Sequence, residues 1–178
     1  MAIDKRMEAA LNEQIKWELY SSYLYLSMSS WYESVGLKGF AGWEYIQAQE
    51  EKDHAMKIFR YVISRGGRVI LHPIDAPPSE WASPLDAFQV SLEHEQKVTS
   101  MINNLVDLSI DLKDHATHNM LRWFVDEQIE EEEDAGEIVD KLRMIEEGGG
   151  KQMLFMLDKE LGTRVYTPLQ PGMAPGQQ

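Results

Sequence analysis

Four long stretches of helical periodicity, interrupted by one proline-rich segment, narrow the folds that this chain can adopt. The first stretch repeats one helix face every seven residues, at Leu11, Glu18, Tyr25 and Tyr32. The second stretch ends at the glycine pair 66–67, the third spans about 84–112, and the fourth spans about 114–147. These patterns predict four long α-helices.

The connections between these stretches predict how the helices are arranged. The first two stretches are separated only by a turn around Gly36 and Gly39, and so short a link favours an antiparallel hairpin. Four prolines lie between residues 68 and 84, so this segment cannot form a long helix. Ser83 followed by Pro84 is typical of a helix start. We therefore expect an all-α, antiparallel four-helix bundle with one long crossover.

The C-terminal part of the chain predicts one more helix and a tail. The glycine run 148–150 ends the fourth stretch, and apolar residues from Met153 to Leu161 predict a short fifth C-terminal helix. We expect this helix to pack against neighbouring subunits, with packing on its own bundle as the alternative. The predicted domain is 1–163, followed by a flexible tail at 164–178.

Charge and cysteine usage exclude several classes of function. The formal net charge of −13 disfavours nucleic acid and anionic membrane partners and favours cations. Because the chain has no cysteine, any metal must be bound by oxygen and imidazole ligands. The N-terminal segment lacks an apolar signal region, and no apolar run approaches membrane-spanning length. We expect a soluble, cytoplasmic protein.

Polar residues that are able to bind metal interrupt the inward stripe of each predicted helix. They are Glu18, Glu51 with His54, Glu95, and Gln128 with Glu131. The second hairpin repeats the first, because 33 residues separate Glu18 from Glu51 and also Glu95 from Gln128. Residues three apart share one helix face. An internal two-fold relationship would bring all six side chains to one site in the middle of the bundle.

Burial of several carboxylates needs compensation by cations or hydrogen bonds. Each of these residues alone is more often a solvated surface residue, and a single E-x-x-H pair is weak support for a metal site. Together they predict a metal site with oxygen and imidazole ligands, which suits iron, manganese or zinc without choosing among them.

Five segments resemble the non-haem ferritins of bacteria and archaea. They are WELYSSYLY (17–25), QEEKDHAMK (49–57), EHEQ (93–96), WFVDEQIEEEE (123–133) and LDKEL (157–161). The resemblance implies a catalytic diiron centre. Its first iron would be bound by Glu18, Glu51 and His54, and its second by Glu51, Glu95 and Glu131. Gln128 would lie adjacent, and Glu51 would bridge the two ions.

The resemblance also implies further site residues. Tyr25 matches a tyrosine beside the diiron centre, and Trp123 matches a nearby aromatic residue. A third iron site would use Glu50, Glu127 and Glu130 with the shared Glu131. Glu132, Glu133 and Asp134 are better interpreted as a solvated helix face.

By the same resemblance we expect iron storage and detoxification. Ferrous iron would be oxidised by dioxygen or hydrogen peroxide, and the ferric mineral would be stored in a cage of twenty-four identical subunits. Because Gln128 and Glu131 replace a second Glu-x-x-His unit, we expect weaker binding of the second iron.

Related helical proteins fit the sequence less well. A bacterioferritin-like protein would carry a second E-x-x-H, and its haem methionine position holds Lys52 here, so no haem is expected. A rubrerythrin-like peroxidase needs cysteines. A purely structural bundle would need basic residues on the inner faces, and the stripes described above have none. A mini-ferritin places its iron site between subunits and lacks this set of residues within one bundle.

Overall fold

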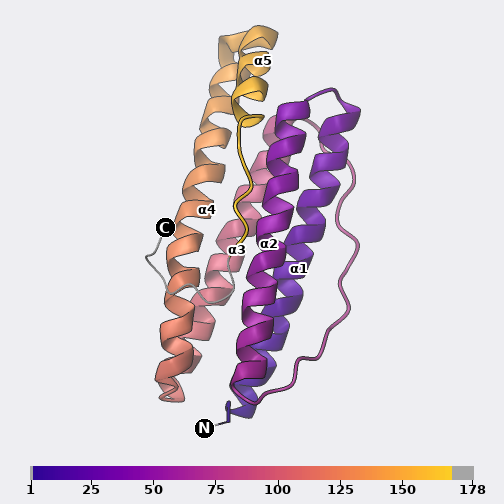
Figure 1. The fold of residues 1–178 in the computed structure, drawn as a ribbon. Coiled ribbons are helices and arrows are strands. Elements are labelled where there is room, and N and C mark those ends of the chain that lie inside the picture. The colour runs from indigo at the N-terminus through magenta and orange to yellow at the C-terminus, as the bar shows by residue number, and fades with distance from the viewer. Residues whose placement is uncertain (1, 170–178) are drawn as a thin grey trace.

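The computed structural model describes residues 2–169, and all regular secondary structure within this range is helical (Figure 1). The helices are α1 (Lys5–Ser34), α2 (Lys38–Ser64), α3 (Pro84–Asp111), α4 (His115–Met144) and α5 (Gly150–Leu161). A π-helical turn, Ile145–Gly149, lies between α4 and α5.

The helices form two antiparallel hairpins, α1 with α2 and α3 with α4, joined by the long segment 65–83. In Figure 1 this segment runs along the outside of the α1/α2 hairpin from one end of the bundle to the other. Helix α1 also packs against α3. The predicted four-helix bundle with one crossover and a short fifth helix is therefore confirmed. None of the helices described is long and apolar enough to cross a membrane.

Side chains cap three of the long helices at their N-termini. The Asp4 carboxylate accepts a hydrogen bond from the Arg6 amide, and the Ser83 hydroxyl accepts one from the Asp86 amide. Asp114 does the same for the Thr117 amide at the start of α4. Each cap satisfies a backbone donor that has no partner within its own helix.

Helix α2 obtains its cap from α5. Its own N-cap residue, Leu37, makes no capping hydrogen bond with its side chain. Instead Asp158 Oδ1 accepts hydrogen bonds from the amides of Gly39 (2.8 Å) and Phe40 (3.1 Å). A Cβ at position 39 would lie 1.6 Å from the Asp158 carbonyl oxygen, so the close approach of the two helices requires glycine.

One face of α5 packs on its own bundle. Leu157 and Leu161 are buried in a cluster with aromatic and aliphatic residues of the long helices. The alternative in which α5 folds back on its own subunit is therefore the one observed for this face. Met153, Phe155 and Met156 of α5 are exposed.

The C-terminal region differs from the predicted boundaries in two places. Helix α4 ends at Met144, three residues before the predicted end, because the π-helical turn begins there and Gly148 leaves helical geometry. Residues 164–169 were predicted as tail, yet in the structure they make hydrogen bonds to α2. The remainder of the predicted tail, 170–178, lies outside the described residues.

Two apolar clusters form the core, one toward each end of the bundle. On α1, Leu11 and Ile15 belong to one cluster, whereas Leu24 and Tyr25 belong to the other. Glu18 lies between them along the helix. The polar inward residues therefore occupy a central layer with apolar packing on both sides.

Candidate metal centre

All six residues predicted at the site are buried in this central layer. Their exposed fractions are Glu18 1%, Glu51 1%, His54 2%, Glu95 2%, Gln128 3% and Glu131 8%. Each long helix contributes at least one of them, because the inward stripe of every helix carries a polar residue at the same level.

Five of these side chains form two overlapping groups. Glu18, Glu51 and His54 present ligand atoms that all lie within 4.8 Å of one another, and Glu51, Glu95 and Glu131 do the same. Glu51 belongs to both groups. The 33-residue repeat in the sequence therefore predicted side chains that the structure brings together.

His54 faces carboxylates with both ring nitrogens. Its Nδ1 lies 3.6 Å from Glu51 Oε2 and 4.0 Å from Glu18 Oε2. Its Nε2 lies 3.9 Å from Glu127 Oε2. The imidazole can therefore offer one nitrogen to a metal ion while the other interacts with a carboxylate.

Two donors orient Glu95. The Tyr25 hydroxyl donates a hydrogen bond to Glu95 Oε1, and Gln128 Nε2 donates one to Glu95 Oε2 at 3.1 Å. Gln128 thus lies adjacent to the second group, as predicted. Tyr25 is fully buried, and its location beside Glu95 matches the position implied by the resemblance.

Two glutamines at the site were not among the predicted site residues. Gln14 Nε2 donates to Glu18 Oε1 at 2.8 Å, and Gln47 Nε2 donates to Glu131 Oε2 at 2.5 Å and lies 3.5 Å from Glu51 Oε1. Gln14 precedes Glu18 by four residues and Gln47 precedes Glu51 by four, which places each glutamine one helix turn from a predicted ligand on the same face. That repeated spacing is a sequence signal that identifies both.

Burial and mutual repulsion disfavour the ionised form of these carboxyls. Burial first, and then the charges of Glu95 and Glu18, raise the pKa of Glu51 well above its ordinary value. Burial followed by Glu95 and Glu51 raises the pKa of Glu131 in the same way. Burial also raises the pKa of Glu95, although the hydrogen bonds from Tyr25 and Gln128 oppose this.

A cation fits this donor set. Glu18 Oε2 is buried and has no hydrogen-bond partner among the described residues, so one carboxylate oxygen remains available as a ligand. Divalent ions bound between the two groups would offset the repulsion that raises these pKa values. Carboxylate oxygens with one imidazole suit first-row divalent ions.

The predicted third-site residues are arranged less tightly. Glu127 joins His54 and Glu131 in a third group of ligand atoms within 4.8 Å. Glu130 is exposed and belongs to none of the three groups. Glu50 is half-buried and forms an ion pair with Arg164 at 2.6 Å.

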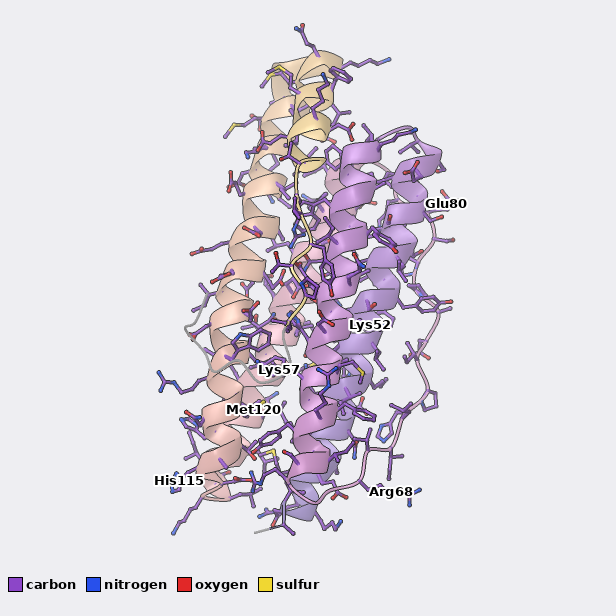
Figure 2. All side chains as sticks on the ribbon, viewed as in Figure 1. Lys52, Lys57, Arg68, Glu80, His115 and Met120 are labelled. Carbon is purple, nitrogen blue, oxygen red and sulfur yellow. The ribbon has the colours of Figure 1, made fainter. Side chains whose placement is uncertain are left out.

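Trp123 forms one wall beside His54, and the two ring centroids are 5.2 Å apart. Lys57, labelled in Figure 2, extends from α2 on the side that faces α4, and its Nζ lies 3.7 Å from the centroid of the Trp123 ring. Burial lowers the pKa of Lys57. This cation lies at the edge of the acidic layer.

Glu44 is a fully buried carboxyl that lies outside the three groups. Glu44 is 0% exposed, and neither of its oxygens has a hydrogen-bond partner among the described residues. It precedes Glu51 by seven residues, which places it on the same stripe of α2. Sequence reasoning did not identify it, although this heptad spacing was a visible signal.

Comparisons with known proteins agree with this geometry. The family model of the ferritin-like domain matches residues 8–145. A bacterial non-heme ferritin of Bacteroides fragilis is 43% identical over 162 residues, which are 91% of this chain and 99% of that protein. One from Campylobacter jejuni is 42% identical and covers 88% of this chain and 93% of its own length.

Solved structures give the same relationship. A structure described as an open pore ferritin from the hyperthermophilic archaeon Archaeoglobus fulgidus has a TM-score of 0.90 and 53% identity. The match covers 92% of this chain and all of that chain. Since the family model spans most of the sequence and these relatives align over nearly their full length, the chain belongs to the ferritin family.

Proposed function

We propose that this chain is the subunit of an iron-storage protein and that its central layer is a ferroxidase site, where two ferrous ions are oxidised as substrates. Membership of the ferritin family supports iron storage. The observation that carries the ferroxidase proposal is that Glu51 belongs to two adjacent groups of metal-competent side chains.

In the proposed reaction the first ferrous ion binds Glu18, Glu51 and His54, and the second binds Glu51, Glu95 and Glu131. Each ion loses one electron, and two electrons with two protons convert one dioxygen molecule into hydrogen peroxide. Carboxylates suit this reaction because they change between terminal and bridging coordination and tolerate both oxidation states. Gln128 and Tyr25 orient Glu95 through hydrogen bonds.

The ferric product would then move toward storage. Glu127 reaches His54 and Glu131, which supports transfer through a third site that also uses Glu50 and Glu130. The second ion has no imidazole in its group, so we expect it to bind more weakly than the first. The proposal includes a cage of twenty-four copies in the cytoplasm, with ferric oxyhydroxide inside, as in the family that the sequence resembles.

Stopped-flow absorbance tests the site directly. The metal-free protein is mixed with two ferrous ions per subunit in air, alongside Glu51→Ala and a control, Glu93→Ala, which changes an exposed glutamate on α3. Rapid formation of a ferric species by the wild type and the control, with at least a tenfold slower rate in Glu51→Ala, is the expected result. Equal rates in all three proteins would refute a ferroxidase site at Glu51.

A further inference from the structure

Residues 164–169, here called the C-terminal strap, lie along α2 beside the acidic layer. In Figure 1 the chain leaves α5 and descends next to α2. Arg164 and Tyr166 are partly buried, whereas Val165 between them is 80% exposed. This alternation is the two-residue period of an extended segment with one side against the protein.

Four hydrogen bonds fix the strap. Arg164 Nη1 donates to Gln47 Oε1 at 2.8 Å, and Arg164 Nη2 donates to Glu50 Oε2 at 2.6 Å. The Tyr166 hydroxyl (2.6 Å) and the Leu169 amide (3.1 Å) both donate to Asp53 Oδ2. The acceptors lie on successive turns of α2, so the extended strap matches the helix turn by turn.

Arg164 is held on a third side by an aromatic ring. Its guanidinium carbon lies 4.4 Å from the centroid of the Trp43 ring, which supports a cation–π interaction. Its side chain is 21% exposed. The guanidinium is therefore fixed in direction, with one nitrogen toward each of its two acceptors.

The contact with Gln47 reaches the metal centre. An amide has one acceptor oxygen and one donor nitrogen, so binding of its oxygen by Arg164 turns the nitrogen the other way. Gln47 Nε2 accordingly faces Glu131 and Glu51. Arg164 thereby fixes the orientation of an amide that holds two candidate iron ligands.

The contact with Glu50 puts a positive charge where an iron ion is proposed to bind. Burial raises the pKa of Glu50, and Arg164 is the strongest influence in the opposite direction. A carboxylate bound by a guanidinium has fewer free oxygens for a metal ion. A cation that coordinates Glu50 must therefore displace Arg164 or share this carboxylate with it.

We propose that Arg164 is a cationic latch: it competes with a metal ion for Glu50 and releases Gln47 when that ion binds. The inference rests on the proposed function, since it concerns the third ion of the same site. Metal arriving at Glu50 would loosen the strap and free the Gln47 amide, which would weaken its hold on Glu131 and Glu51. Filling of the third site would in this way favour release of iron from the other two.

Anaerobic calorimetric titration of the metal-free protein with ferrous iron tests the latch. The variants are Arg164→Ala, Arg164→Lys and Glu50→Ala, with Arg143→Ala as a matched control whose partner, Asp140, is exposed. Arg164→Ala removes the charged hydrogen bond to Glu50 that opposes metal binding, so its affinity for the third ion should be about tenfold or more higher than that of the wild type. Arg164→Lys keeps the charge without the two-pronged contact and should give an intermediate affinity.

The double variant Arg164→Ala with Glu50→Ala completes the test. The double variant should bind the third ion with the same affinity as Glu50→Ala alone, because Arg164 has no carboxylate at position 50 for which to compete with the ion. A damaged fold would lower the affinity for the third ion. A higher affinity in Arg164→Ala can therefore be attributed to the loss of competition for Glu50. The latch is overturned if Arg164→Ala binds the third ion with unchanged or lower affinity, or if no variant binds a third ion.

The titration also separates this inference from the proposed function. If the wild type binds two tight ions that Glu51→Ala loses, the diiron site stands whatever Arg164 does. If the wild type binds no pair of ions, the proposed function itself fails.

Discussion

The carboxyl of Glu44 allows a direct measurement of how much an unpaired buried group destabilises this bundle. The side chain is 0% exposed and neither oxygen has a partner among the described residues. Burial raises its pKa well above the ordinary value, and the nearby charge of Arg164 only partly opposes this. We therefore predict that Glu44→Met stabilises the metal-free protein.

The expected magnitude follows from the unsatisfied polar atoms. An unpaired buried polar group costs about 1–3 kcal/mol. Methionine has a similar length, no charge and a flexible side chain that fills irregular space. The substitution should therefore raise the free energy of unfolding by about 1–3 kcal/mol, which corresponds to about 2–4 °C in Tm for each kcal/mol in a chain of this size.

The gain should also depend on pH. The folded-state pKa of Glu44 is raised above its unfolded value, near 4.5, so below that value the carboxyl is protonated in both states. As pH rises from there through the folded pKa, the carboxyl ionises more readily in the unfolded state, and the free energy of unfolding of the wild type falls. Wild type and Glu44→Met should therefore differ less at pH 5 than at pH 8.

Guanidinium unfolding of the metal-free wild type and Glu44→Met at pH 5 and pH 8 measures the difference in their free energies of unfolding. The protein concentration is kept fixed, because subunit association shifts apparent stability. Glu33→Met, which changes an exposed glutamate of α1, is the matched control. A variant that is no more stable than the wild type, or a gain identical at both pH values, would refute the reasoning. Glu44→Met should bind as many ferrous ions as the wild type, and loss of one ion would show that Glu44 is a ligand instead.

Two further predictions concern the central layer of carboxylates and α5. The raised pKa values of Glu51, Glu95 and Glu131 mean that metal-free stability should fall as pH rises above about 4.5. A divalent ion such as Zn²⁺ at 100 times its Kd should restore about 2.7 kcal/mol per site; guanidinium midpoints that are independent of pH and zinc would contradict this. Asp158→Ala should destabilise the protein by about 1–2 kcal/mol, because it removes the cap of α2. Asp158→Asn keeps an acceptor oxygen, so its free energy of unfolding should fall by less than that of Asp158→Ala in the same assay. An equal decrease in both variants would argue against capping.

The long helices could be predicted because local signals and tertiary packing agree at their ends. Ser83 with Pro84 marks the start of α3, and the glycines at 66–67 mark the end of α2. The prolines between 68 and 84 similarly require the crossover. The end of α4 was less predictable, since a π-helical turn has no sequence pattern as clear as a helix cap.

The central layer of carboxylates and His54 could be predicted because its residues obey a spacing rule. The 33-residue separation and the three-residue pairs express the symmetry of two hairpins, and both are visible without coordinates. Glu130 was not predicted by this rule but by the resemblance to ferritins, as a residue of a third iron site. In the structure it is exposed on α4 and belongs to none of the three groups.

The interactions that could not be predicted join segments remote in sequence. Asp158 caps a helix that begins 120 residues earlier, and Arg164 contacts Gln47 across 117 residues. Neither residue belongs to a periodic stripe, so neither carries a local signal of its partner. The prediction that no basic residue serves the inner faces considered only the stripes of the long helices. Arg164 instead approaches the acidic layer from an extended segment, because the docking of α5 on α2 directs the chain that follows it along that helix. The position of Arg164 is thus determined by the packing of the fifth helix, through contacts that only the folded chain reveals.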